Sequence, residues 1–407
     1  MALLHLPLST IDEAQLDRLI KAKAAEARDI EYKRDTYGGS DADHAEWLAD
    51  ISSFANTVGG DLLIGMVASK GVPTVLSPIT VAPDDEILRL EQIARSGLQP
   101  RIPNLQFKAV PVAGGGHVLL IRIPRSFNPP HRVIRQGKGH NRFWARSSAG
   151  KYEPNVDELR TLFTLAPQLA DRIRDFRFDR VAQIVAGNAP VQLLDRTCLI
   201  MHVVPFAALD PRSLISLEQI ERDPSAYPPF GRSAANNWRI NFDGILLLSN
   251  NDASASAQRA YVQVFRSGIV EAVASRVASG ERTNGAPSFL QSIKIEGMLL
   301  TNGMRYLKSL QIQGVEPPYV VLISLVGVKG NAIKAGISVD WSDGDDVSVL
   351  DRDQLHFTEV ILETVPQSVQ ELGAMVRPLI EQIANASGQA RSSSFGPNGE
   401  YLHHFAP

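Results

Sequence analysis

The sequence is poor in cysteine and has no long apolar run. Its 407 residues include a single cysteine, Cys198, so no disulfide can form within the chain, which is typical of a reducing compartment. No apolar run reaches the ~20 residues that a membrane-spanning helix needs. The first residues, MALLHLPLST, lack the basic and apolar regions of a signal peptide. Together these absences predict a cytoplasmic protein without a membrane partner.

Several catalytic signatures are also missing. The Walker pattern G-x4-G-K-[ST] does not occur, because Met66 stands where its lysine would follow the spaced pair Gly60 and Gly65. There is no G-x-S-x-G nucleophile motif, and no set of cysteines and histidines has zinc spacing. The sequence therefore argues against ATP hydrolysis, serine nucleophile chemistry and a zinc site.

The most informative absence is that of acidic residues between Glu91 and Glu153. The whole chain has a net charge of −3, yet residues 92–152 contain no Asp or Glu and 11 Lys or Arg. A near-neutral protein with one wholly basic segment is a candidate for binding a polyanion, because these side chains neutralise phosphates. The predicted nucleic-acid-binding residues are Arg122, Arg125, Arg132, Arg135, Lys138, Arg142, Trp144 and Arg146.

Trp144 has two interpretations. On a strand it points to the same side as Arg142 and Arg146, and an aromatic ring beside two arginines can stack on an unpaired base. Alternatively, Trp144 belongs to the core and the arginines extend from a solvated edge. The sequence does not distinguish DNA from RNA, or single strands from duplexes.

The length predicts two domains, since a single core rarely grows beyond ~250–300 residues. Mixed helices and short strands predict an α/β (mixed α+β) fold for residues 1–165. We expect a helical linker at 166–190 and a second α/β domain of unknown function at 191–386. Residues 387–407, rich in Gly, Ser and Asn, predict a flexible tail. The sequence is compatible with a homo-oligomer and does not determine the oligomeric state.

Residues 26–65 combine a charged strand, a helix and a buried strand. Glu31 and Lys33 alternate with apolar residues, which predicts a strand with its charges on one face. A helical pattern over 41–57 follows, and Gly59 can take the left-handed conformation that ends such a helix. The apolar run LLIG then predicts a buried strand.

The phrases E-x4-EYK and SFANTVGGDLLIG resemble the Schlafen-type AlbA-like domain of bacterial proteins. The resemblance implies an N-terminal nucleic-acid-binding module, with regulation or phage defence as its setting. Asn56 and Thr57 lie within the second phrase. They can either bond free carbonyls at a helix end or contact a phosphate, and the sequence leaves both interpretations open.

The resemblance also implies a rival function, that of a metal-dependent endoribonuclease. Nuclease members of the Schlafen family are similar to this chain at two glutamates, here Glu26 and Glu31, which would hold Mg²⁺ or Mn²⁺ while Lys33 contacts phosphate. Those members carry an acid just after the LLIG-like strand, where this chain reads GMVASK; Asp61 or Asp29 would replace it only with a different geometry. We therefore expect nucleic-acid binding that requires no cofactor. A protein-interaction scaffold is the third hypothesis.

Overall fold

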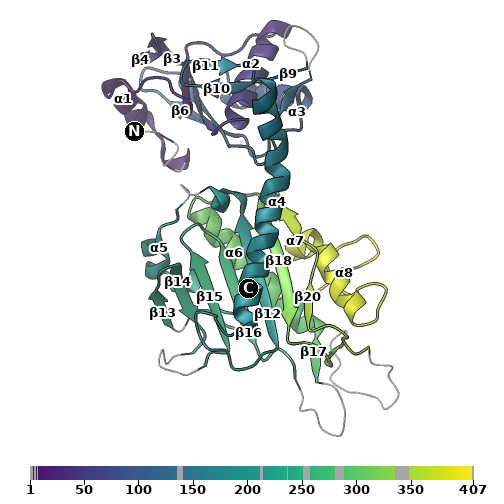
Figure 1. Ribbon diagram of the computed structural model, residues 1–407. Helices are drawn as coiled ribbons and strands as arrows, with labels where there is room; N and C mark the ends of the chain where they lie inside the picture. The colour runs from purple at the N-terminus through teal and green to yellow at the C-terminus, as the bar shows by residue number, and fades with distance from the viewer. Residues whose placement is uncertain are drawn as a thin grey trace. The chain divides into compact units, whose positions relative to one another are not determined.

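The computed structural model describes most of the chain, in two compact units, Met1–Ala170 and Asp171–Pro407 (Figure 1). The described residues are 3, 6, 8–134, 141–210, 214–235, 237–250, 257–279, 288–334 and 348–405. The predicted mixed α/β class is confirmed. No helix among the described residues is long and apolar enough to cross a membrane. Two predicted site residues, Arg135 and Lys138, lie outside the described residues.

The first unit is built on a four-stranded sheet in the order β1-β2-β7-β6. β1 runs parallel to β2, and the other neighbours are antiparallel. The strands are β1 (Ile30–Lys33), β2 (Gly60–Ile64), β6 (Gln106–Pro111) and β7 (His117–Ile123).

Helices cover both faces of this sheet. α2 (Asp41–Ala55) and α3 (Pro83–Gly97) pack on one face, where Leu62 joins their core. α1 (Glu13–Lys21) packs on the other face, where Leu63 is buried. Successive strand residues point to opposite faces, so the apolar run of β2 serves both cores.

Local sequence sets the limits of α2. Ser40 caps its first turn, and Asp43 returns the bond to the Ser40 backbone. The chain leaves the helix through Gly59, whose φ of 74° is left-handed, as predicted. A Cβ at Gly59 would lie 2.6 Å from the backbone nitrogen of Arg125, so this position also requires glycine for close packing.

Short strands complete the first unit. They are the hairpin β3 (Met66–Ser69) and β4 (Val72–Leu76), the three-stranded sheet β5 (Leu98–Gln99), β8 (Arg132–Val133) and β9 (Arg142–Phe143), and the hairpin β10 (Ala145–Ser147) and β11 (Gly150–Tyr152). The strand expected around Trp144 is therefore two short strands, with Trp144 between them.

α4 (Val156–Val185) carries the chain from the first unit into the second. The sequence predicted a domain end at 165 and a separate linker at 166–190. The structure has one helix through this region, with Pro167 inside it.

The second unit has an antiparallel sheet in the order β13-β14-β15-β16-β12-β18-β20, and β21 also pairs with β18. The second half of α4 packs on one face, and α6, α7 and α8 pack on the other. The elements are β12 (Cys198–Pro205), α5 (Leu217–Arg222), β13 (Asn237–Ile240), β14 (Gly244–Leu248), β15 (Ala260–Phe265), β16 (Val270–Ser275), α6 (Ser292–Ile312), β18 (Tyr319–Val326), β20 (Gln354–His356), β21 (Val360–Leu362), α7 (Val369–Met375), α8 (Arg377–Ala386), and the parallel pair β17 (Phe289–Gln291) and β19 (Ala332–Lys334).

The tail at 387–407 was predicted to be flexible; its described part, residues 387–405, packs against this unit. Tyr401 is buried, and its hydroxyl donates to Glu296 Oε2 at 2.8 Å. A Cβ at Gly373 would lie 2.5 Å from the Tyr401 ring, so glycine makes room for it. The prediction weighed the small polar residues and overlooked the aromatic anchor, whose burial offsets the cost of ordering the segment.

Candidate functional site

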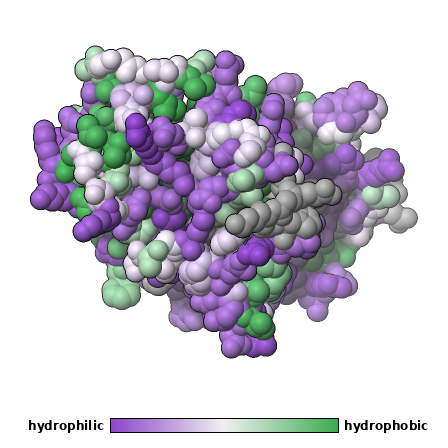
Figure 2. Space-filling view, turned by 90° about the horizontal axis from the view of Figure 1, so that it is seen from above, coloured by the Kyte–Doolittle hydropathy of each residue, from purple (hydrophilic) through white to green (hydrophobic). Residues whose placement is uncertain are grey.

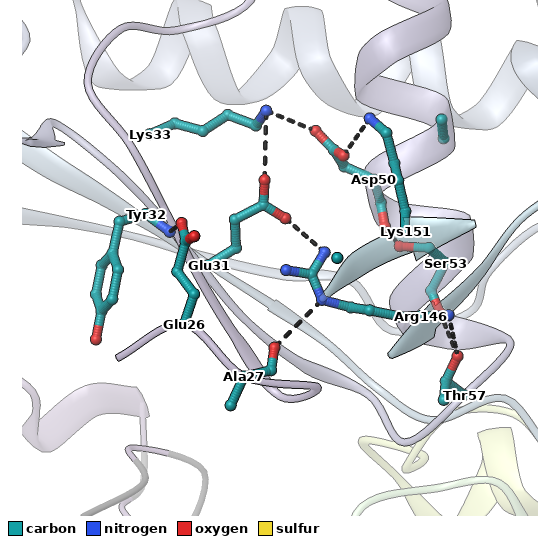
Figure 3. Close-up of polar contacts among 12 residues, drawn as sticks. Glu26, Ala27, Glu31, Tyr32, Lys33, Asp50, Ser53, Thr57, Arg146 and Lys151 are labelled. Atoms are coloured by element: carbon teal, nitrogen blue, oxygen red, sulfur yellow. Dashed lines mark hydrogen bonds and ion pairs between the residues drawn. The ribbon is translucent and has the colours of Figure 1, made fainter. Parts of the chain in front are cut away.

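The charged face of β1 points toward α2. Ile30 and Tyr32 are buried in the core on the α1 side, so Glu31 and Lys33 extend to the opposite side. This places the predicted pair on one face, as expected. The lysine meets a residue that the sequence prediction omitted: Lys33 Nζ lies 3.0 Å from Asp50 Oδ2 and 3.5 Å from Glu31 Oε1 (Figure 3).

Asp50 is the centre of this charge network. Its side chain is only 1% exposed, and it accepts hydrogen bonds from Lys151 Nζ at 2.7 Å and from the Tyr37 hydroxyl at 2.6 Å. Burial alone would raise the pKa of Asp50, but the charges of Lys151 and Lys33 outweigh it and lower the pKa. The carboxylate is therefore ionised and fully partnered inside the unit.

Arg146 closes the other side of the network. Its Nη1 lies 2.5 Å from Glu31 Oε2, and its guanidinium stacks 4.2 Å from the centre of the Phe54 ring. The residue is only 3% exposed. This corrects the prediction that Arg146 presents its charge to nucleic acid, because both its charge and its planar face are already used within the fold.

These residues line a pocket of about 310 Å³, which we call the ionic pocket. Its charged lining residues are Glu26, Glu31, Glu46, Asp50, Lys70, Arg146 and Lys151. Glu26 Oε1 accepts a hydrogen bond from the backbone nitrogen of Tyr32 at 3.1 Å. Both glutamates predicted as metal ligands therefore border the same pocket, although they hold different partners (Figure 3).

The ionic pocket does not fit a divalent ion. Mg²⁺ needs several oxygen ligands, usually with retained waters. Here Glu31 is neutralised by Arg146 and Lys33, and Asp50 by Lys33 and Lys151. Among the residues that the structure describes, no group of three or more His, Cys, Asp or Glu side chains has the arrangement of a metal site. A metal would have to displace buried ion pairs.

Arg122, another predicted phosphate contact, also pairs internally. Its Nε lies 2.8 Å from Asp61 Oδ1, and its two terminal nitrogens donate to the carbonyls of Leu6 and Leu3. Asp61 is buried, and burial raises its pKa although Arg122 opposes the shift. The prediction for Arg122 is corrected because β2 and β7 are neighbours, which sets Asp61 directly across from Arg122.

Asn56 fixes the segment that carries the remaining arginines. Its Oδ1 accepts from the backbone nitrogen of His131 at 2.7 Å, and its Nδ2 donates to the carbonyls of His131 and Trp144. Thr57 Oγ1 accepts from the backbone nitrogen of Arg146 at 3.0 Å. Both side chains therefore bind protein backbone, which favours the structural interpretation over a phosphate contact.

Trp144 belongs to the core, the alternative that the sequence left open. It is half-buried and packs against the cluster under α2 and α3. The neighbouring Phe143 forms an edge-to-face pair with Phe163, with ring centres 5.7 Å apart. Its half-buried ring therefore contacts the fold, and a base-stacking role for Trp144 stays a prediction.

Among the described residues of the acid-free segment, the exposed arginines are Arg95, Arg101 and Arg142, and the half-buried Arg132 lies beside Arg142; we call these four the arginine surface. Arg132 and Arg142 stand on the neighbouring strands β8 and β9. Arg142 pairs with the exposed Glu153, and Arg132 Nη2 donates to Gln99 Oε1 at 2.9 Å. The predicted Arg125 is also half-buried and lies on neither β8 nor β9.

The sequence prediction did not assign six charged residues of these two regions to a site: Glu46, Asp50, Lys70, Lys151, Arg95 and Arg101. One signal was readable. Asp50 lies three residues after Trp47 and four before Phe54, so it occupies the apolar stripe of α2, where an acid requires a buried partner. No pattern identified Lys151 as that partner, because it lies 101 residues further along.

Comparison with known proteins supports the resemblance seen in the sequence. Residues 26–155 match the family model described as Schlafen, AlbA_2. No curated protein matches the chain. Among solved structures, the DIP2311 protein from Corynebacterium diphtheriae is 15% identical, with a TM-score of 0.26; the match covers 37% of this chain and 31% of that protein.

A second solved structure is the N-terminal domain of a RecG-related protein from Nitrosomonas europaea. It is 22% identical, with a TM-score of 0.26, and the match covers 36% of this chain and 94% of that domain. The family match lies in the first unit and includes both the ionic pocket and the arginine surface. Residues 26–155 of this chain are therefore a Schlafen AlbA_2 domain.

Proposed function

We propose that this protein binds nucleic acid through the arginine surface of its Schlafen AlbA_2 domain. The observation that carries the proposal is the separation of charges in the first unit. Buried acids such as Asp50 and Asp61 hold cations within the fold, whereas Arg95 and Arg101 have no ion-pair partner among the described residues. Cations that remain available at a surface are those that phosphates can contact.

Exposed guanidinium groups favour an anionic ligand. The face of the molecule that Figure 2 shows is mostly hydrophilic, with apolar groups interspersed. The binding needs no cofactor, since guanidinium groups contact phosphate oxygens directly. A cytoplasmic setting, in regulation or phage defence, is the context that this proposal implies.

The test compares two double variants of equal charge change. Arg101→Ala with Arg132→Ala removes two members of the arginine surface. Arg34→Ala with Arg160→Ala removes two arginines that are 70% exposed elsewhere in the same unit. Affinity for labelled DNA and RNA is measured over a range of salt concentrations.

We expect the first variant to bind more weakly and to reduce the salt slope by about 1.4–1.8, the value for two phosphate contacts. The control should keep most of its affinity and slope. Equal losses in both variants would show that binding does not use the arginine surface. Absence of salt-dependent binding by the wild type would leave the protein-interaction scaffold.

A metal-dependent ribonuclease remains the second candidate, because Glu26 and Glu31 border one pocket with Lys33 beside Glu31. The surroundings of Glu31 do not support it, since its charge is already paired with Lys33 and Arg146. Incubation with tRNA and single-stranded RNA in Mg²⁺ or Mn²⁺ tests this candidate directly. Cleavage that is lost in Glu31→Ala but retained in Glu153→Ala would replace the binding-only proposal.

A further inference from the structure

A small pocket lies beside the arginine surface, at the end of α3. Its volume is about 200 Å³, and it is lined by Glu91, Ala94, Arg95, Arg101, Ile102, Asn104 and Leu105. Glu91, Ala94 and Arg95 share one helix face, because residues three and four apart are neighbours on a helix. The remaining lining residues come from the segment that follows β5.

The pocket has an apolar floor and a cationic rim. Ile102 and Leu105 are half-buried and pack against the core under α2 and α3, which holds the floor in place. Arg95 and Arg101 are exposed at the rim. A guanidinium is planar and weakly hydrated, so it can stack on a flat ring as well as contact a phosphate.

A third arginine extends the rim toward the sheet. Arg132 lies opposite Gln99 in the β5–β8 ladder and donates to its side chain at 2.9 Å. Gln99 is two residues before Arg101 in the chain. The backbone of a bound strand can therefore contact Arg132 and Arg101 while one of its groups enters the pocket.

The size and charge of the pocket restrict that group. A volume of about 200 Å³ exceeds the ~30 Å³ share of one water molecule but is below the ~300–1,000 Å³ of pockets for drug-sized ligands. A pocket of this volume can accommodate one heterocyclic ring. The carboxylate of Glu91 in the lining would repel a phosphate, whereas the amino groups of a base can donate to it.

We propose that this pocket receives one unpaired base of a single-stranded nucleic acid, with neighbouring phosphates on Arg95, Arg101 and Arg132. The inference rests on the proposed function and adds to it the class of nucleic acid. In a duplex the bases are stacked and paired, so only a single strand can place a ring on the apolar floor without unpairing.

The experiment uses the full chain and three labelled ligands of equal length: a single strand, an abasic single strand and a duplex. The abasic strand keeps the phosphates and removes the bases. We expect the single strand to bind about tenfold more tightly than the abasic strand, the scale of one stacked base. The single strand should also bind more tightly than the duplex at the same salt concentration.

The variant Arg95→Lys with Arg101→Lys keeps both charges and removes both planar groups. It should reduce the roughly tenfold preference for bases to about twofold. Arg34→Lys with Arg160→Lys is the matched control and should keep the full preference. Equal binding of the single strand and the abasic strand by the wild type would overturn the base pocket while salt-dependent binding still supports the proposed function. A preference that the lysine variant retains would also overturn it.

Discussion

The ionic pocket and the arginine surface are both rich in cations, but they use them in opposite ways. In the pocket, Lys151 and Arg146 each lie within hydrogen-bonding distance of a buried or half-buried carboxylate. On the surface, Arg95 and Arg101 have no such partner among the described residues. All four belong to the segment that lacks acids. A segment that is acid-free in the sequence is therefore not acid-free in space, because acids from residues 31–61 fold onto part of it.

The strongest test of this comparison removes the acid at the centre of the pocket. Asp50→Ala leaves two lysines and the Tyr37 hydroxyl without their buried partner, and we expect a loss of about 3–5 kcal/mol in the free energy of unfolding. Glu46→Ala is the matched control, since Glu46 approaches the same lysines but is 50% exposed. It should cost less than about 1 kcal/mol. Urea unfolding followed by tryptophan fluorescence measures both; equal losses would show that burial does not decide the pairing.

The second unit repeats the paired arrangement around the fully buried Glu271. Burial would raise the pKa of Glu271, but hydrogen bonds from Arg180 and His202 outweigh it and lower the pKa to about 2. A lowered carboxyl pKa contributes stability that is complete above about pH 4.5 and is lost as the pH falls toward 2. The expected loss is about 3 kcal/mol, measured by hydrogen exchange in β12 and β16.

Glu271→Gln should remove this acid dependence, whereas Glu218→Gln, at an exposed carboxyl, should leave it in place. The Tyr261 hydroxyl also donates to Glu271, and only Glu271→Gln changes this acceptor. An acid transition of unchanged size in Glu271→Gln would mean that other carboxylates cause it.

Two arginine variants should separate stability from binding. Arg122→Ala leaves the buried Asp61 without its partner and should cost about 2–3 kcal/mol, with an unchanged salt slope for nucleic-acid binding. Arg132→Ala should leave the free energy of unfolding nearly unchanged and reduce the salt slope. Its side chain bonds only the exposed Gln99 in the described structure. Urea unfolding and binding at several salt concentrations check the pair. A reduced slope in Arg122→Ala would break the distinction between paired and available cations.

A smaller effect is expected at Asn56, which bonds the backbone of His131 before β8 and of Trp144 after β9. Asn56→Asp keeps the acceptor for the His131 backbone but places a carboxylate against two carbonyls. The expected cost is about 1–2 kcal/mol, with faster hydrogen exchange at the backbone amides of His131 and Arg146. Asn155→Asp is the control, since either residue caps a helix equally well. Unchanged hydrogen exchange at these amides would show that Asn56 does not hold the backbone around β8 and β9.

The smallest expected effect is that of a divalent ion on the pocket. Mg²⁺ should leave the melting temperature unchanged at matched ionic strength, because the carboxylates already hold lysine and arginine. A rise of several degrees that disappears in Glu31→Gln would contradict this and would support the nuclease candidate. Differential scanning fluorimetry measures the shift.

Sequence reasoning succeeded where local patterns carry the information. Alternation on β1 placed Glu31 and Lys33 on one face, and Gly59 ended the helix as expected. It failed where packing overrides composition. Tyr401 anchors a tail rich in small polar residues, and α4 continues through Pro167. For the tail, a contact between residues 105 positions apart decided the outcome.

The candidate site shows the same division. The family motif and the basic segment were readable, and they indicated the correct unit. Trp144 satisfied every sequence requirement of a stacking residue, yet its ring packs against the core. The position of Asp50 on the apolar stripe of α2 indicated a buried charge. The residue spacing along the helix could not identify the partners of that charge.

The sequence by itself determined the fold class, the Schlafen AlbA_2 domain and the excess of positive charge between residues 92 and 152. Only the tertiary structure decided which of those charges are available. The ion pairs that neutralise the other charges join residues far apart in the chain. Arg122 lies 61 positions from Asp61, and Arg146 lies 115 positions from Glu31. The composition gives the number of charges in a segment but not their partners. Because Coulomb attraction acts through space, strand order and burial determine which arginines remain for a ligand.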